Sequence, residues 1–456
     1  MCKGDDPTCA YFEAHRRQFH EDMAKERKAG VATLAAGPLS LVPRALKRPP
    51  GTRHHFLPAN ADTVHWGYFS RHLKPQLEVE SGDLVTIETL THQASDDHER
   101  MIEGDPGAES VFLWTKNKKA VERRGAAEGD GKGLGVHICT GPVLVHGAEP
   151  GDILEVRILE VTPRPSASPK FRGLTFGSNA AANWGFHYND LLTGDRPREV
   201  VTIYEVDATG ERNWARAVYN FRWPTVVDPF GGEHKTIDYP GLPVDHGKTQ
   251  RNWDVLKGVR IPIRPHFGVM GLAPKEADVV NSNPPSYTGG NIDNWRIGKG
   301  ASVYYPVSVP GALLSVGDPH ASQGDSELCG TAIECSLTGT LQLILHKAAD
   351  IDGTPLQMLD FPMIETADDW LMQGFSYPNY LAQLGPNAQT DIFAKGSIDL
   401  AMRDAFRKMR HFLMNAKKLT EDEAISLMSI AVDFGITQVV DGNWGVHAIV
   451  KKNIFT

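Results

Sequence analysis

The sequence predicts a β-rich α+β protein, in which a β-sandwich or barrel-like core carries long loops and a smaller C-terminal α+β part follows. The first sign is the alternation of apolar and polar residues in short runs after Gly-Asp turns, which is typical of half-buried strands. The second is a long middle region without periodicity. The third is a helical pattern that appears only near the C-terminus.

Residues 1–57 are predicted to form an N-terminal arm, because a polar helical stretch passes into the Pro-punctuated link VPRALKRPPG with little alternation. The body of the protein is expected to begin near Phe56. Arg16 and Arg17 resemble a twin-arginine export signal, but the segment HEDMAKERK that follows is charged where such a signal needs an apolar region. We therefore expect a cytoplasmic protein, with export through a degenerate signal as the alternative.

Residues 58–350 are predicted to form the β-rich core that carries the chemistry. Leu77 and Val79 alternate with glutamates, and Val85 and Ile87 continue the alternation after a turn at 81–83. A further strand is expected after the turn GAEPGD (147–152), and SLTGTLQLIL (336–345) predicts another. Repeated modules of this kind favour a β-sandwich or barrel.

Residues 166–305 are rich in Pro, Gly, Asn and Trp, which predicts long functional loops over a rigid sheet. Residues 351–456 are expected to form a C-terminal α+β segment that completes the fold. There Ser397 can cap one helix, and Thr420 with Glu423 forms a capping box before a second helix.

Composition narrows the classes of partner. A net charge of −9 gives no basic footprint for nucleic acid, and no apolar run approaches the roughly 20 residues that span a bilayer. The 5 cysteines include no CxxC pair, so neither a disulfide framework nor a zinc ribbon is indicated. Glycine-rich phosphate-binding motifs are also missing, which argues against nucleotide cofactors. A small-molecule partner is the expectation that remains.

The densest cluster of chemistry-bearing residues is GDPHASQGDSE (317–327), which continues through LCGTAI to Glu334. Its glycines permit tight turns, so His320, Asp325 and Glu327 are expected to converge from a loop. Imidazole and carboxylate are ligands of catalytic zinc, and a spare carboxylate would serve as a base. The alternative is a polar turn with surface carboxylates, since no standard zinc pattern is matched.

Two histidines lie in other candidate segments. His65 stands beside Trp66 in DTVHWGYFS, where it could line a pocket or be a hydrogen-bonded core residue. His137 lies close to Cys139 in GVHICTGP, so a cysteine nucleophile with a histidine base is conceivable. A buried structural thiol is favoured instead, since nothing nearby indicates a lowered thiol pKa.

The paired glycines of TGGNIDNW (288–295) would let Asn291 and Asp293 project from a turn into a cleft. Asparagine there could hold an amide or an oxyanion. An ordinary Asx-turn is the alternative.

Several long motifs occur along the chain: HWGYFS with SGDLVTIET, HICTGPVLVHGAEPGDILEVRI, GLAP with TGGNIDN, VPGALLSVGDPHASQGDSELCGTAIE, and SIAVDFGITQVVDGNWGVHAIVKK. Through them the chain resembles the acetamidase/formamidase family from about residue 58 to its C-terminus. The resemblance implies a β-sandwich core and metal-dependent hydrolysis of formamide, acetamide or related small amides and lactams. It also implies that His320, Asp325 and Glu327 handle a metal or a water molecule.

The resulting hypothesis is that a divalent metal, expected to be Zn²⁺, is held by His65, His320 and Asp325 and lowers the pKa of a water molecule. Glu327 would take the proton of that water, with Glu334 as the second candidate base.

The substrate-binding residues are expected to be Asn291, Asp293, His137 and Trp66, with Asn291 also stabilising the oxyanion. A homo-oligomer is expected from the size of the chain. The rival from another class is a non-catalytic module that binds a sugar or another small ligand, given the many tryptophans and Gly-rich loops.

Overall fold

The computed structural model describes residues 52–113, 135–194, 198–209, 213–228, 231–237, 241–242, 244–357 and 359–455. Most of the expected N-terminal arm, with Arg16 and Arg17, lies outside these residues. The last four residues of that arm form strand β1 (His54–Leu57), which pairs in parallel with β5 (Leu84–Glu88).

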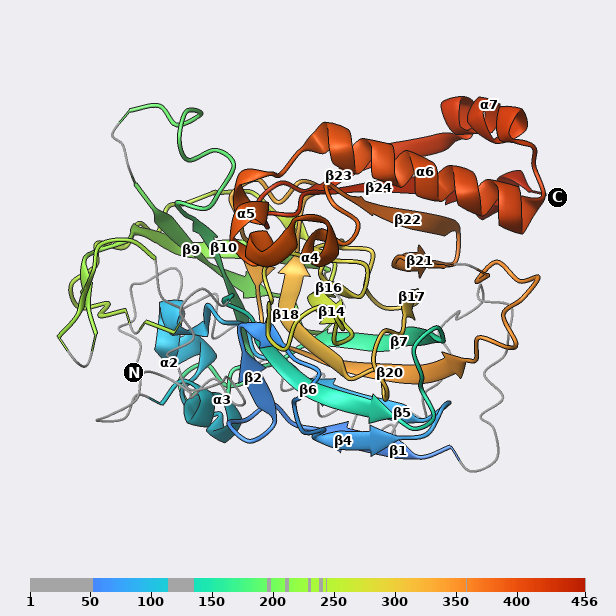
Figure 1. Cartoon of the computed structure of the whole chain (residues 1–456). Helices are drawn as coiled ribbons and strands as arrows, with labels where there is room; N and C mark the ends of the chain where they lie inside the picture. Colours follow the sequence, from blue (N-terminus) through green and yellow to red (C-terminus); the bar gives the residue numbers. More distant parts are fainter. Residues whose placement is uncertain are drawn as a thin grey trace.

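Two large sheets make up the body of the described chain (Figure 1). The first has 9 strands in the order β1, β5, β20 (Leu337–His346), β7 (Ile153–Pro163), β17 (Ser302–Pro306), β21 (Met363–Glu365), β22 (Asp369–Phe375), β24 (Gly445–Lys451) and β23 (Val432–Gln438). The strands of the C-terminal segment thus extend the sheet that the core strands begin.

The second sheet has 11 described strands, of which a path of neighbours runs β13 (Ile261–Pro262), β10 (Trp214–Arg222), β9 (Val200–Val206), β8 (Thr175–Ala181), β19 (Ile333–Glu334), β18 (Leu314–Ser322), β14 (His266–Gly271) and β16 (Gly289–Asn291). Strand β6 (Ile138–Val145) also pairs with β18, and it carries β2 (Val64–Trp66) and β4 (Leu77–Val79). Two small ribbons pair β11 (Val226–Val227) with β12 (Glu233–His234), and β3 (Tyr68–Phe69) with β15 (Val280–Asn281).

The main core lies between the two sheets. Val85 of β5 and Leu343 of β20 belong to the same buried cluster as Phe267 of β14 and Val316 of β18. Side chains from two facing sheets that bury one another define a sandwich. The predicted β-rich α+β class with a sandwich core is therefore confirmed.

The alternating runs form strands as predicted at Leu77–Val79, Leu84–Glu88, Ile153–Pro163 and Leu337–His346. The turn at 81–83 does not close a hairpin, because β4 pairs with β6 whereas β5 pairs with β1 and β20. It carries the chain from one sheet to the other, with Gly82 at φ 98°.

The longer helices pack on the outer face of the first sheet at its C-terminal strands. Helix α6 (Ile398–Lys417) lies against β22 and β24, and α7 (Glu421–Ala431) follows it (Figure 1). Ser397 caps α6 through Leu400 N, and the capping box of Thr420 and Glu423 begins α7, so both predicted caps are confirmed. The shorter helices are α2 (His98–Met101), α3 (Pro106–Val111), α4 (Tyr380–Gln383), α5 (Ala388–Asp391), and the 3₁₀ turns η1 (Ala94–Asp97), η2 (Gly385–Asn387), η3 (Ile392–Ala394) and η4 (Lys452–Ile454).

The middle region does not consist of loops alone. Within 166–305 the structure has strands β8, β9, β10, β14, β16 and β17 beside shorter ones. Strand β14 is buried at every position and β9 at all but its first. Strands that are buried on both faces do not alternate between apolar and polar residues. The alternation that predicts a half-buried strand is therefore absent from this region. Among the described helices, none is both long and apolar enough to cross a bilayer.

Candidate active site and metal centre

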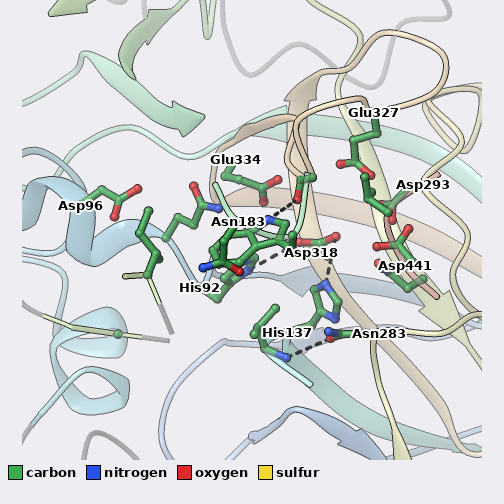
Figure 2. Close-up of a pocket in the computed structure, with 18 of the residues that line it drawn as sticks. His92, Asp96, His137, Asn183, Asn283, Asp293, Asp318, Glu327, Glu334 and Asp441 are labelled. Carbon is green, nitrogen blue, oxygen red and sulfur yellow. Dashed lines mark hydrogen bonds and ion pairs between the residues drawn. The ribbon is translucent and has the colours of Figure 1, made fainter. Parts of the chain in front are cut away.

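A cavity of about 560 Å³ opens where β18, β19 and β16 of the second sheet meet the loops around residues 92 and 441 (Figure 2). Its lining is rich in titratable and amide side chains. The polar lining residues are His92, Gln93, Ser95, Asp96, His137, Asn183, Thr236, Asn283, Asn291, Asp293, Asp318, Glu327, Glu334 and Asp441.

Strand β18 organises the floor of the cavity. The sequence predicted a loop at 317–327, but residues 314–322 form a fully buried strand. Asp318 and His320 are two residues apart on it, so both side chains lie on one face. The register places His320 opposite His266 of β14 and Glu334 of β19. Gly268 of β14 leaves the space into which Asp293, Asp318 and His320 extend.

Asp318 lies among three imidazoles. Its Oδ2 is 3.1 Å from His320 Nε2 and 3.5 Å from His137 Nε2, and its Oδ1 is 3.6 Å from His92 Nδ1. Burial alone would raise the pKa of Asp318, but the neighbouring imidazoles His137, His320 and His92 together hold that pKa well below its usual range. Asp318 is therefore an ionised carboxylate in a buried site.

The imidazoles themselves differ in charge. Burial lowers the pKa of His92 and of His137 to about 4 each, so both are neutral near pH 7. His137 Nδ1 is 2.9 Å from Ser282 Oγ, which leaves Nε2 toward Asp318. Burial also acts on His320, but Glu334 and Asp318 outweigh it and raise the pKa of His320.

His320 links two groups of carboxylates. Its Nε2 lies 3.1 Å from Glu334 Oε1, and its Nδ1 lies 3.9 Å from Asp293 Oδ1. The same Nδ1 is 3.0 Å from His266 Nε2 and 3.1 Å from Gln323 Oε1. His266 and Gln323 therefore already engage this nitrogen.

A second group of carboxyls gathers beside the first (Figure 2). Burial and the nearby carboxylates raise the pKa of Asp293 and of Glu327 well above their ordinary values. Burial likewise raises the pKa of Asp441 to about 8, with a contribution from Asp318. Glu327 holds its position with a φ of 47°, a left-handed conformation that costs free energy and is typical of functional sites.

Several of these buried polar atoms have no hydrogen-bond partner among the residues that the structure describes. They are His92 Nδ1, Asn291 Oδ1, Asp293 Oδ1, Asp318 Oδ1, Glu334 Oε2 and Asp441 Oδ2. An unpaired polar atom in a protein interior costs free energy unless a ligand satisfies it. Among the described residues, two groups bring three ligand atoms within 4.8 Å of one another: His92 with Asp318 and Glu334, and Asp293 with His320 and Glu327.

The structure brings together most of the residues that the sequence singled out. His137, Asn291, Asp293, Glu327 and Glu334 line the cavity, and His320 contacts this group from β18.

The metal-ligand set expected from the sequence, however, is not assembled. His65 is buried on β2 with its Nε2 2.9 Å from Ser315 Oγ. Asp325 forms an ion pair with Arg296 at 3.0 Å and accepts from Trp295 Nε1 at 2.9 Å. Neither belongs to a three-ligand group within the described part of the chain.

Trp66 lies apart from the cavity as well. It is buried against Phe112, and it donates its indole N–H to the carbonyl oxygen of Val136. Cys139 is also buried and absent from the cavity lining. Burial raises the pKa of its thiol well above the ordinary value, which argues against a cysteine nucleophile.

Sequence reasoning missed His92, Gln93, Asp318 and Asp441. Asp318 lies in the acidic motif, two residues before His320. In a strand this spacing puts both side chains on one face, so a strand prediction for this segment would have identified Asp318. Asp441 lies in the quoted C-terminal motif, within VVDGNWG. His92 and Gln93 stand in THQASDD, where no pattern distinguishes them from an ordinary polar loop.

A family model places this chain among known proteins. The model of the acetamidase/formamidase family matches residues 133–283 and 277–456. The chain belongs to the acetamidase/formamidase family.

It is 33% identical over 218 residues to an acetamidase of Mycolicibacterium smegmatis, an alignment that covers 43% of this chain and 50% of that protein. It is 34% identical over 212 residues to a formamidase of Methylophilus methylotrophus, which covers 44% and 49%. The chain thus spans about half the length of the curated relatives it matches.

Solved structures share the fold over nearly the whole chain. A crystal structure of an acetamidase from Bacillus halodurans superposes with a TM-score of 0.58 at 21% identity, covering 88% of this chain and 98% of that one. An acetamidase from Yersinia enterocolitica gives a TM-score of 0.59 at 21% identity, covering 89% and 94%.

Proposed function

We propose that this protein hydrolyses the C–N bond of an amide to a carboxylic acid and an amine or ammonia. The observation that carries the proposal is the cavity floor, where neutral imidazoles, an ionised carboxylate and carboxyls of raised pKa lie together. Groups with pKa values displaced in opposite directions are typical of acid–base sites. Membership in a family with relatives named acetamidase and formamidase supports amides as the substrate class.

The residues that would hold a divalent metal are His92, Asp318 and Glu334, with His137 next to them. His92 has a lowered pKa, and its Nδ1 has no hydrogen-bond partner among the described residues, so a lone pair there is available to an ion. Asp318 and Glu334 each have a buried carboxylate oxygen to which no described residue donates. Nitrogen and oxygen ligands of this kind fit Zn²⁺, which we propose as the metal. When bound, such an ion acts as a Lewis acid and lowers the pKa of a water molecule.

The alternative group around Asp293 is less suited to a metal. The His320 nitrogen that faces Asp293 is Nδ1, at 3.9 Å from Oδ1, and this nitrogen already contacts His266 Nε2 and Gln323 Oε1. We therefore assign the carboxyls of this group, Asp293 and Glu327, together with Asp441, to proton transfer.

Glu327 is the proposed proton carrier. Burial and the nearby carboxylates raise the pKa of Glu327, and a carboxylate whose conjugate acid has a raised pKa is a stronger base toward water. We infer that a carboxylate oxygen of Glu327 takes the proton of the water that attacks the amide carbon. The same carboxyl then gives the proton to the nitrogen as the C–N bond breaks, so that the leaving group departs as a neutral amine.

Two amide side chains would orient the substrate. Gln93 is buried in the cavity wall, and no described residue forms a hydrogen bond with its Nε2 or its Oε1. One such side chain can donate to a substrate carbonyl and accept from a substrate N–H. Asn291, also in the lining, has an acceptor oxygen, Oδ1, that receives no hydrogen bond from the residues that the structure describes.

The test is ammonia release from formamide, acetamide, propionamide, phenylacetamide and a γ-lactam by the purified chain loaded with Zn²⁺. Glu327→Gln keeps the shape of the side chain but removes the proton acceptor, so kcat should fall by roughly 10²- to 10⁴-fold. The matched control is Glu149→Gln, an exposed residue on the turn before β7, which should keep parental activity.

Three results would count against the assignment. Parental activity in Glu327→Gln would remove the proton-transfer role of this carboxyl. A metal-free Glu327→Gln protein would make Glu327 a metal ligand instead of the proton carrier. Saturable amide binding without any ammonia release would favour the non-catalytic binding module.

A further inference from the structure

We propose that the cavity selects amides that carry an aromatic-sized apolar substituent rather than formamide or acetamide. This inference rests on the proposed amide hydrolysis and specifies its substrate class. Its basis is the apolar part of the cavity lining, which includes Trp184, Trp223, Ile237, Leu242 and Phe393.

The size of the cavity is the first argument. A volume of about 560 Å³ lies inside the range of roughly 300–1,000 Å³ in which drug-sized ligands bury most of their surface. Formamide and acetamide would fill only a small part of it. Water would occupy the remainder, and a water-filled site weakens the electrostatic contacts that favour the transition state.

The aromatic side chains are the second argument, because they are fixed against the reactive loops. Trp184 donates its indole N–H to the Gly330 carbonyl oxygen at 3.1 Å, and Gly330 lies in the chain between Glu327 and Glu334. A Cβ built at Gly330 would lie 2.1 Å from Trp184 Cδ1. Only glycine, here at φ 87°, lets the indole lie this close to the loop.

Phe393 packs closely against the loop that carries Asp441. A Cβ at Gly442 would lie 3.0 Å from Phe393 Cδ1, and this glycine has a φ of 72°. Phe393 is nonetheless 48% exposed and Trp184 36% exposed. Large aromatic side chains that are held in place yet exposed in a cavity mark a surface for an apolar ligand group.

Trp223 adds a polar contact within the apolar part. Trp223 belongs to the cavity lining, and its buried indole N–H has no hydrogen-bond partner within the described part of the chain. Binding energy from such remote groups can be used to orient the reacting bond, which raises kcat as well as affinity.

The experiment compares kcat/KM for acetamide, propionamide, benzamide and phenylacetamide with the full chain. A single methylene in an apolar pocket is worth about 10- to 200-fold, so phenylacetamide should exceed acetamide by at least about 100-fold. Phe393→Ala should lower the phenylacetamide-to-acetamide ratio by about 10-fold. The matched control is Phe56→Ala, since Phe56 is a 59% exposed phenylalanine on β1 outside the cavity lining, and this variant should keep the ratio.

Equal kcat/KM for acetamide and phenylacetamide would overturn the inference while leaving amide hydrolysis intact. Absence of ammonia from every amide would instead overturn the proposed function. In that case equilibrium binding by tryptophan fluorescence still decides the inference: tighter binding of phenylacetamide than acetamide supports it, and equal binding contradicts it.

Discussion

Replacement of Gly268 by alanine should disable the site while leaving the fold in place. Gly268 lies on β14, directly beneath the cavity floor. A Cβ at this position would lie 2.3 Å from Asp293 Oδ1, 2.6 Å from Asp318 Oδ2 and 2.6 Å from His320 Cε1. Ordinary contact begins near 3.4 Å, so the Asp293 carboxylate would have to move by about 1 Å.

The expected effect follows from that displacement. A misplacement of about 1 Å in a catalytic constellation can cost about 10²-fold in rate, so kcat should fall by at least that factor. The extra methyl group overpacks a buried position, which costs about 1–3 kcal/mol of unfolding free energy. Asp318 is also a proposed ligand, so bound zinc should decrease together with activity.

The assay is ammonia release at saturating substrate, measured with zinc content and a thermal unfolding curve on the same sample. The matched control is Gly324→Ala, because a Cβ at Gly324 meets nothing within 4 Å and this residue has no positive φ. It should keep parental rate and metal. Full activity and full zinc in Gly268→Ala would refute the placement of the reactive site at this floor.

Three further predictions concern other parts of the chain. Burial would raise the pKa of Glu155, but hydrogen bonds from His346 and Arg157 outweigh it and hold that pKa at about 2, below the ordinary 4.5. The ionised Glu155 carboxylate therefore stabilises the folded protein above pH 4.5, and this stabilisation is lost as the pH falls toward 2. Glu155→Gln should lower the free energy of unfolding by about 3 kcal/mol at pH 7. In urea unfolding, the difference in unfolding free energy between the parent and Glu155→Gln should be about 1 kcal/mol smaller at pH 4 than at pH 7. A difference that does not change with pH would contradict the lowered pKa of Glu155. Cys139→Ala should cost about 1 kcal/mol and keep its turnover, whereas loss of turnover in a folded variant would revive a cysteine nucleophile. Gln93→Leu should raise KM about 10-fold or more in steady-state kinetics, and an unchanged KM would remove Gln93 from substrate binding.

The sequence predicted those parts of the fold in which one face meets water. Strands β5 and β7 alternate because their outer residues are polar, and the caps of α6 and α7 depend on local hydrogen bonds. Strands β9 and β14 are buried on both faces, so their residues do not alternate between apolar and polar. Their composition indicates burial, but it does not indicate a strand.

The sequence predicted those site residues that lie close to one another along the chain. Glu327, Glu334 and His320 lie within one acidic motif, so the sequence places them together. His92 and Asp441 join them only through long-range contacts of the sandwich, which no local pattern reveals. The prediction of Asp325 as a ligand did not foresee Arg296, whose guanidinium pairs with that carboxylate. The cytoplasmic location and the homo-oligomer stay predictions.

Ammonia release as a function of bound zinc tests the proposed metal centre most directly. The full chain is stripped with a chelator, its metal content is measured, and activity is followed as Zn²⁺ is returned. Turnover should disappear with the metal and rise in proportion to the zinc that is rebound. Asp318→Asn should neither rebind zinc nor recover activity. Full turnover in a preparation shown to be free of metal would contradict the assignment of His92, Asp318 and Glu334 as a metal centre.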